Sequence, residues 1–221
     1  MNTVNIMIAY VYVVNICGTL PGMAGNGYHH GALREAILKA AFDEARRVGP
    51  AGVQVRALAK AVGVSPAAVY RHFPNIEALQ AEVSQTARET LAEFLIAERE
   101  TVTTRRSRTA TARERFRAVG RAYVEFAQRE PNLFDTAFGP AVASPRPDEP
   151  SAWNVLIEGV EALIETGAIP SRDTGAAAVI AWSGVHGIAS IVVRRALVGP
   201  LDGEEAIDAV LDGIMRAIET L

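Results

Sequence analysis

The sequence predicts an all-α fold, in which a small N-terminal helix-turn-helix domain of three helices is followed by a larger helical domain. Two observations support this prediction. After residue 30, apolar residues recur at three- and four-residue spacing along nearly the whole chain, which is the period of an α-helix. Glycines and prolines fall between these periodic segments, where they end one helix and precede the next.

The periodic segments predict nine helices, over residues 33–48, 55–62, 65–73, 75–95, 110–129, 131–138, 151–167, 172–198 and 203–220. Gly49-Pro50 ends the first helix, and Gly63 ends the second. Ser65-Pro66 combines a capping side chain with a proline at the first helical position, and Asn75 can cap the long helix that follows. Residues 140–150 contain four prolines and are expected to form a loop.

Composition and charge narrow the class of protein. The chain has 221 residues, 49% of them hydrophobic, so it can bury a real core. Its single cysteine, Cys17, excludes an internal disulfide and is typical of reducing cytoplasm. No run of 18 or more apolar residues is present to cross a membrane. The net charge of −3 is uneven: residues 34–73 carry +4 and 105–129 carry +6, whereas 130–221 carry −9. A basic N-terminal part and an acidic C-terminal part indicate a small polyanion-binding domain joined to a larger domain with a different function.

Residues 1–22 form a separate, uncharged segment. Its apolar run, from Ile6 to Val14, is too short to span a bilayer and has no Lys or Arg before it, as a secretion signal would have. Met23 stands just ahead of the first clear helical pattern. A strand, a weak signal-like segment, and translated sequence ahead of the true start therefore all remain open.

The glycines after this segment resemble a dinucleotide-binding turn. Gly25, Gly27 and Gly31 follow an apolar run and precede a helix, but their spacing is G-x-G-x-x-x-G instead of G-x-G-x-x-G. No second strand with a terminal acid follows. A NAD(P)-dependent enzyme is therefore kept only as an alternative.

Residues 55–73 carry the main functional signal. Two short helices are joined by Gly63-Val64-Ser65, with apolar residues between them, which is the arrangement of a helix-turn-helix. Gly63 suits the left-handed bend that ends the first helix. An ordinary helical hairpin is the alternative. The second helix, however, offers small and polar side chains that fit against DNA, at Ser65, Ala67, Ala68, Tyr70, Arg71 and His72.

Residues 28–79 resemble the DNA-binding domain of TetR-family transcriptional regulators. The glycine turn, the Val-Tyr-x-His-Phe-Pro end of the second short helix and the helix after it occur in the family's order. The opening Tyr28-His29-His30-Gly31 resembles one subgroup of the family, and Trp182, His186 and Gly187 match the Trp-x-x-x-His-Gly element of that subgroup's C-terminal domain. His29 and His30 are expected at a helix start and not in a metal site, because no other ligands lie near them in sequence.

The resemblance implies that the helix from Ser65 to Phe73 enters the major groove of DNA. Tyr70 and His72 would bind phosphates, and Ala67 and Ala68 would lie against base edges. Phe73 would lock this helix onto the next one. The implied DNA-binding residues are Gly31, Gln54, Ser65, Pro66, Ala67, Ala68, Tyr70, Arg71 and His72.

Two positions depart from the family pattern. Gln54 stands where the family usually has Ser or Thr, and Ile76 stands where it usually has Lys. Because a lysine there would pair with a phosphate, we expect one fewer phosphate contact per subunit and a weaker salt dependence of DNA binding.

The C-terminal body resembles the family in architecture, which implies ligand binding and dimerisation. Its last two helices are rich in small residues and resemble the family's dimer-forming pair. His186 is interpreted either as a satisfied buried histidine or as a ligand contact. Large aromatic side chains on neighbouring helices either line an apolar cavity or form ordinary core. The candidate ligand-binding residues are Phe126, Phe134, Phe138, Trp153, Trp182 and His186.

These observations predict a cytoplasmic, homodimeric regulator, a repressor, that binds a palindromic DNA operator and is released by an unknown small-molecule effector. No enzymatic activity, cofactor, metal or membrane partner is expected. The expected divisions are an extension over residues 1–27, a DNA-binding domain over 28–75 and a ligand-binding and dimerisation domain over 76–221. The alternatives are the NAD(P)-dependent enzyme and a helical interaction protein that does not bind DNA.

We expect a chain that starts at Met23 to fold, dimerise and bind DNA like the full chain, because residues 1–22 carry no charge and precede every recognisable pattern. Thermal melting, size-exclusion chromatography and DNA titration of the two chains check this. A loss of folding or of DNA binding on truncation would contradict it.

Overall fold

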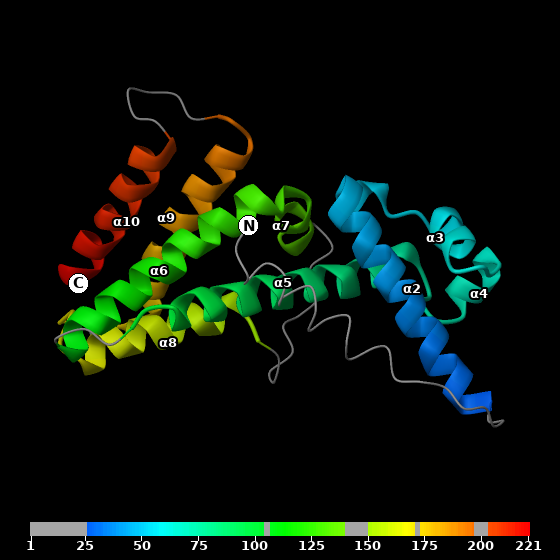
Figure 1. The fold of residues 1–221 in the computed structure, drawn as a ribbon, viewed down its shortest axis with the longest axis horizontal. Helices are drawn as coiled ribbons and strands as arrows, with labels where there is room; N and C mark the ends of the chain where they lie inside the picture. Colours follow the sequence, from blue (N-terminus) through cyan, green and yellow to red (C-terminus); the bar gives the residue numbers. More distant parts are fainter. Residues whose placement is uncertain (1–25, 104–106, 140–149, 171–172, 197–202) are drawn as a thin grey trace. The chain divides into compact units, whose positions relative to one another are not determined.

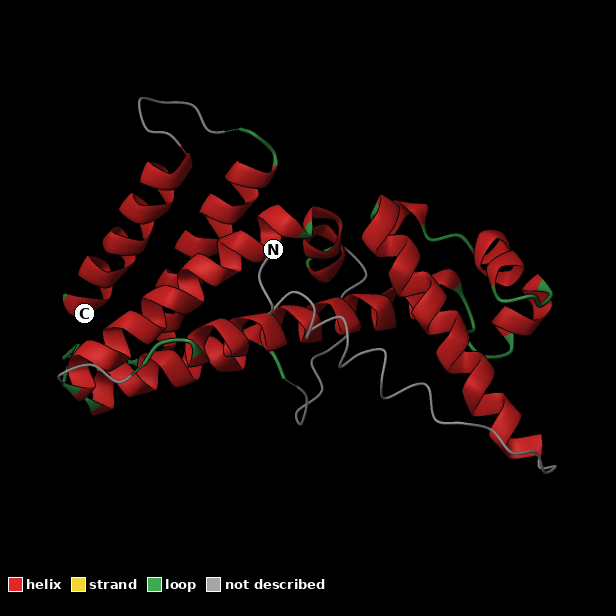
Figure 2. Cartoon of the chain, in the orientation of Figure 1, coloured by secondary structure: helices red, strands yellow, loops and turns green. Residues whose placement is uncertain are grey.

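The computed structural model describes residues 26–103, 107–139, 150–170, 173–196 and 203–221, with side chains from residue 31 onward. The chain divides into two units, residues 1–33 and 34–221. The expectations for Ile6 to Val14, Cys17 and the Met23 start lie outside the described residues. Within the described residues the protein consists of nine α-helices and one short 3-10 helix, with no strand, which confirms the predicted all-α class (Figure 2).

The N-terminal helices follow the predicted order: α2 (Asn26–Val48), η1 (Pro50–Gly52), α3 (Val55–Ala61) and α4 (Pro66–Tyr70). Gly63 between α3 and α4 has a φ of 72°, the left-handed conformation that the turn requires. The Ser65 hydroxyl accepts a hydrogen bond from the Ala68 amide at 3.3 Å, as expected of a helix cap. Helix α4 ends at Tyr70, three residues earlier than predicted, and residues 71–73 form a turn that leads into the next helix.

Helix α5 (Ile76–Glu100) extends from the helix-turn-helix to the C-terminal helices (Figure 1). Asn75 caps it, with its side-chain oxygen accepting from the Ala78 amide at 2.7 Å. One face of α5 is buried along its whole length, because apolar residues recur at helical spacing from Leu79 to Leu95. Helix α5 packs against α6, α7 and α8, and its Glu82 pairs with Arg34 of α2.

The C-terminal body contains α6 (Arg108–Arg129), α7 (Pro131–Ala137), α8 (Ala152–Glu165), α9 (Thr174–Val193) and α10 (Gly203–Glu219). Ser107, Ser151 and Asp173 cap α6, α8 and α9, each accepting from the amide three residues on. Helix α6 packs against α5, α8 and α9, and α9 packs against α10. Most of the large buried side chains of the body belong to one continuous core.

Two glycines allow α10 to approach the rest of the body closely. A Cβ atom at Gly120 of α6 would lie 2.7 Å from the Leu211 side chain, and one at Gly184 of α9 would lie 2.9 Å from Ile214. Outside this apolar contact, arginines of α6 pair with acidic residues of α10. We call this set the ion-pair ladder: Arg113 with Glu219, Arg117 with Asp208 and Asp212, and Arg121 with Glu204 and Asp208.

Helix α9 differs from one expectation drawn from the sequence. It carries no charged residue and is long and apolar enough, by length and composition, to cross a membrane, although the sequence was expected to contain no such segment. A third of that apolar window is buried inside the protein, and Ala177, Ala181 and Ile188 belong to the core. Its exposed face includes Val179 and Ile191.

Candidate DNA interface and effector cavity

The second helix of the helix-turn-helix presents most of its predicted contact residues to solvent. Tyr70 is 50% exposed, and His72 is partly buried. Ala68 is only 5% exposed, because it lies on the inner face of α4 beside the buried Val69. The Ala68 methyl group therefore packs inside the helix-turn-helix, and its burial does not support the predicted contact with a DNA base. The exposed members of the set on and beside α4 are Ser65, Pro66, Ala67, Tyr70 and Arg71.

Phe73 is buried in the turn after α4, and its ring contacts Arg34 of α2, whereas the expected contact was with the helix that follows. It is 1% exposed, and the Arg34 guanidinium of α2 lies over its ring, 4.9 Å from the ring centre. Arg34 also pairs with Glu82 of α5. The ring therefore holds the turn after α4 against α2, and Arg34 links this contact to α5.

The cations of the helix-turn-helix are available to bind phosphate. Arg56, Lys60 and Arg71 are exposed and have no carboxylate partner within the described residues. In α2, by contrast, most cations already pair with carboxylates. Arginine and lysine side chains that are not already paired can neutralise DNA phosphates, and this releases counterions from the DNA. The positive charge of this domain that has no carboxylate partner is therefore carried by α3 and the turn after α4.

Three further positions that the sequence analysis named lie outside α4: Gln54, Gly31 and Ile76. Gln54 is exposed and precedes α3, but its side chain forms no capping hydrogen bond. Gly31 of α2 is exposed, with open space where a Cβ would be. Ile76, in the place of the usual lysine, is half-buried at the start of α5 and supplies no charge.

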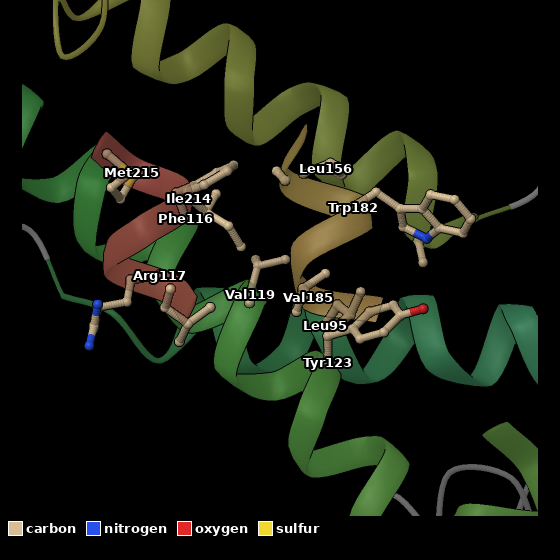
Figure 3. Close-up of a pocket in the computed structure, with 14 residues that line it drawn as sticks. Leu95, Phe116, Arg117, Val119, Tyr123, Leu156, Trp182, Val185, Ile214 and Met215 are labelled. Carbon is tan, nitrogen blue, oxygen red and sulfur yellow. The ribbon is translucent and has the colours of Figure 1, made fainter. Parts of the chain in front are cut away.

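A small apolar cavity of about 40 Å³ lies in the C-terminal body between α6, α8, α9 and α10 (Figure 3). Of the six predicted ligand-binding residues, Trp182 alone lines it. Aliphatic and aromatic side chains form nearly all of its wall, and side chains of α10 close one side of the cavity. The lining residues are Leu95, Phe116, Arg117, Val119, Gly120, Tyr123, Ala152, Leu156, Ala181, Trp182, Val185, Leu211, Ile214 and Met215.

The other predicted aromatic residues do not surround this cavity. Phe134 and Phe138 pack against His186, with ring centres 5.4 and 4.9 Å away. Phe126 is buried against Phe94. Trp153 is 43% exposed near the start of α8. Of the two interpretations of these rings, cavity wall and ordinary core, the packing favours ordinary core for Phe126, Phe134 and Phe138, and the last two form an aromatic cluster with His186.

His186 is held by a hydrogen bond that the sequence did not reveal. The Tyr123 hydroxyl lies 2.9 Å from His186 Nδ1. A phenol hydroxyl can donate to Nδ1 or accept from an Nδ1–H, so this bond is compatible with either tautomer of the imidazole. The Trp182 ring stacks on the imidazole, with ring centres 5.2 Å apart. Burial, together with the charge of Arg194, lowers the pKa of His186 and favours the neutral form.

Replacing His186 by alanine is expected to lower the free energy of unfolding by about 1–3 kcal/mol, because the buried Tyr123 hydroxyl loses its hydrogen-bond partner. The lowered pKa adds a pH signature. Between the folded and unfolded pKa values the unfolded chain binds more protons, so stability is full above about pH 6.5 and falls as pH drops below it. Thermal melts from pH 7.5 to 5 check both effects.

The alanine variant should lose part of this pH dependence and should bind small molecules in the cavity as the parent protein does. A variant with an unchanged melting temperature that no longer responds to an effector would show instead that His186 contacts the ligand.

Helix α7 is bonded directly to the end of α2, through residues that the sequence did not single out. Asn132 donates hydrogen bonds to the carbonyls of Arg46 and Arg47 at 3.0 and 3.1 Å. The Arg46 guanidinium pairs with Glu130 at the start of α7. At the other end of α7, Arg88 of α5 donates to the Ala137 carbonyl at 3.1 Å. The helix is thus held at both ends by the elements that carry the helix-turn-helix.

A larger hollow of about 540 Å³ opens between the end of α5, the start of α6, and α8. Its rim carries three arginines and three glutamates, so its charge selects neither anions nor cations, and Arg99 and Glu158 on that rim pair with each other at 2.8 Å. The apolar cavity beside Trp182 is therefore the better candidate for a specific ligand.

Two family models match the chain. One, described as bacterial regulatory proteins of the tetR family, matches residues 37–83 and so covers the helix-turn-helix. The other, described as the tetracyclin repressor-like C-terminal domain, matches residues 116–214. No curated protein matches the sequence.

Solved structures share the fold over most of the chain. A protein with unknown function from Rhodococcus sp. RHA1 is 27% identical, with a TM-score of 0.68 over 87% of this chain and 98% of its own. A TetR-family transcriptional regulator from Pectobacterium atrosepticum is 21% identical, with a TM-score of 0.61 over 88% and 96%. RolR, in complex with its ligand resorcinol, is 14% identical, with a TM-score of 0.62 over 87% and 90%.

Proposed function

Because the chain is a transcriptional regulator with the DNA-binding and C-terminal domains of the TetR family, we propose that it is a homodimeric repressor that releases its operator when a small molecule binds. The observation that supports this most directly is the exposed surface of α4 and its flanking turns. Tyr70 at the end of α4 and Arg71 directly after it are both exposed there, and α4 is too short for burial alone to explain it.

We propose that α4 lies in the major groove. Tyr70, Arg71 and His72 bind phosphates and fix the register of the helix, whereas the small side chain of Ala67 allows close approach to base edges. Two such helices in a dimer would have to lie about 34–36 Å apart to meet successive major grooves of a palindromic site. A ligand that favours another spacing would release DNA through its different affinity for the two states.

The exposed apolar face of α9 is better explained by a dimer interface than by a membrane-spanning helix. Val179, Trp182 and Ile191 are exposed apolar side chains on a helix that is otherwise packed into the core. A second copy of α9 and α10 would cover them in a four-helix interface. The protein would then remain in the cytoplasm.

Two motifs would place the protein in one subgroup of the family. They are the opening Tyr28-His29-His30-Gly31 and the element formed by Trp182, His186 and Gly187.

The hydrogen bonds and the ion pair between α7 and α2 could transmit a structural change from the ligand site to the DNA-binding helices. The chain of contacts runs from Trp182 beside the cavity to His186, from His186 to Phe134 on α7, and from Asn132 to the end of α2. RolR, which shares the fold, is solved with a small aromatic ligand, which supports a ligand response in this chain as well. We propose that a ligand shifts α7 and thereby changes the spacing of the two α4 helices.

Replacing Asn132 by alanine is expected to weaken operator binding roughly severalfold without a ligand, because α2 loses two hydrogen bonds that hold it to α7 and the DNA-competent spacing becomes less populated. Fluorescence anisotropy with operator DNA measures the change. Asn154→Ala, at an exposed position on α8, is the control and should leave the affinity unchanged. Equal affinities for all three proteins would contradict the proposed route.

Selection of binding sites from fragmented genomic DNA with the purified full chain tests the function itself. We expect a palindromic site that binds two protomers, and a thermal shift that does not respond to NAD(P). Stabilisation by NAD(P) without DNA binding would support the enzyme alternative. A folded protein that binds neither DNA nor NAD(P) would support the helical interaction protein.

A further inference from the structure

We propose that Arg34 sets the orientation of α4 on DNA, by holding the turn after α4 in a fixed place against α2 and α5. This inference rests on the proposed placement of α4 in the major groove. Arg34 lies on α2, outside the set of residues proposed to touch DNA, and its guanidinium contacts the Phe73 ring in the turn after α4. It therefore acts through Phe73, as a positioning residue.

The position of Phe73 is tied to that of α4 through the backbone. The amides of His72 and Phe73 both donate to the Val69 carbonyl at 3.0 Å, so the turn continues directly from the last residues of α4. Two residues separate Phe73 from the exposed Tyr70. Because Phe73 and Val69 are each 1% exposed and closely packed, a shift of the Phe73 ring would have to move α4 with it.

Arg34 holds this ring with a guanidinium that is itself fixed. The guanidinium carbon lies 4.9 Å from the centre of the Phe73 ring, within the range of a cation–π contact. The same guanidinium pairs with the carboxylate of Glu82 on α5, whose side chain is 24% exposed. A guanidinium is planar, so an ion pair at its nitrogens also orients the face that covers the ring. Helix α2, the turn after α4 and α5 therefore meet at Arg34.

The other cations of α2 make different contacts. Among the described ion pairs of this helix, the remaining ones lie within α2 or join it to α7: Lys39 with Asp43, Arg47 with Glu44, and Arg46 with Glu130. The contact with Phe73 and α5 is therefore specific to Arg34, and is not a general property of positive charge on α2.

The surroundings of Arg34 favour a positioning role over a phosphate contact. Its charge is compensated by Glu82, and its flat face covers Phe73. A phosphate would have to displace a carboxylate that already forms a charge-assisted bond. The two roles predict opposite effects of removing Glu82, which would loosen a positioning residue but free a phosphate-binding one.

The ratio of the affinities for operator and scrambled DNA tests the positioning role. Base contacts require one orientation of α4, whereas nonspecific binding rests on phosphate contacts that many orientations can make. We expect full-length Arg34→Gln to bind the selected operator about tenfold more weakly than the parent protein, and a scrambled duplex within about twofold of it. Anisotropy titrations, made well below the melting temperature of each protein, measure both affinities. An equal loss on both duplexes would overturn the proposal.

Arg34→Lys separates geometry from charge. Lysine keeps the charge and can pair with Glu82, but it has no planar group to cover the Phe73 ring. We expect operator binding to remain about threefold or more weaker than in the parent protein, with an unchanged affinity for scrambled DNA and an unchanged salt dependence. Full operator affinity in this variant would show that charge alone is needed, and would contradict the positioning role.

Glu82→Met distinguishes the two roles by the sign of its effect. We expect weaker operator binding, by about threefold or more, because the guanidinium loses the group that orients it. The double variant with Arg34→Gln should be no weaker than the weaker single variant, because both changes break one unit. An unchanged affinity would overturn the proposal. Tighter binding of both duplexes would show instead that the freed Arg34 binds phosphate.

Lys39→Gln is the matched control. It removes one positive charge from the same helix, but its pair with Asp43 lies within α2, so the ratio of the two affinities should equal that of the parent protein. The same loss of ratio in Lys39→Gln and Arg34→Gln would reduce the effect to net charge. A parent protein that binds operator and scrambled DNA alike, or neither, would reject the proposed function itself. A parent protein that prefers its operator, with an unchanged ratio in Arg34→Gln, would reject only the role of Arg34.

Discussion

Removing the hydroxyl of Tyr70 is expected to weaken binding to every DNA sequence by a similar factor. Tyr70 is half exposed on α4, and its hydroxyl would donate a hydrogen bond to a charged phosphate. Such a bond contributes roughly 1.5–3 kcal/mol, and a dimer on its operator makes it twice, so Tyr70→Phe should cost about 3–6 kcal/mol of binding free energy. Anisotropy titrations with the operator and with a scrambled duplex measure both affinities.

Arg71→Ala separates charge from hydrogen bonding at the same surface. Its loss of affinity should shrink as salt is raised, because each phosphate contact contributes about 0.9 to the slope of the logarithm of the binding constant against the logarithm of salt. Tyr70→Phe should leave that slope nearly unchanged. If Tyr70→Phe altered which sequence is preferred, Tyr70 would be reading a base and its assignment to phosphate would be wrong.

The local structure of the DNA-binding half could be predicted because its signals are local. Ser65 and Asn75 cap the helices they precede, and Gly63 takes the left-handed conformation that its place in the turn demands. Each signal depends only on residues within a few positions along the chain. Ala68 shows the limit of such signals. An alanine fits either face of a short helix, so the sequence did not determine that Ala68 is buried.

The cavity could not be predicted because it depends on which helices meet. Phe134 and Phe138 looked like cavity walls, but α7 brings them to His186 instead. Tyr123 was missed although a signal existed. It continues the buried stripe of α6 that contains Phe116 and Val119, so it could have been placed in the core from helical spacing alone. Its bond to His186 on α9 spans 63 positions and has no local signature.

The uneven charge of the sequence is explained in part by the ion-pair ladder. Within the basic segment over residues 105–129, Arg113, Arg117 and Arg121 are each four residues apart and form one row on α6. That row faces acidic residues of α10, which belong to the acidic stretch 130–221. The spacing was visible in the sequence, whereas the pairing of the two rows follows only from the packing of α10 on α6.

Replacing Phe134 by alanine is expected to cause one of the largest losses of stability in the C-terminal body, about 3–5 kcal/mol. The ring is 2% exposed and contacts Tyr123, Phe138 and His186, so its removal leaves a cavity that these rigid side chains cannot fill by shifting. Urea unfolding followed by circular dichroism measures the change in the free energy of unfolding.

Phe138→Ala is the matched control for this prediction. Phe138 belongs to the same aromatic cluster and directly follows α7, but it is only partly buried, so water can occupy part of the space that its ring leaves. We therefore expect a clearly smaller loss than in Phe134→Ala. Equal losses in the two variants would mean that the cluster responds as a unit, and that burial of the Phe134 ring alone does not set the cost. A loss below about 1 kcal/mol in Phe134→Ala would show that α7 can repack around His186, and the rigid route proposed from the cavity to α2 would then fail with it.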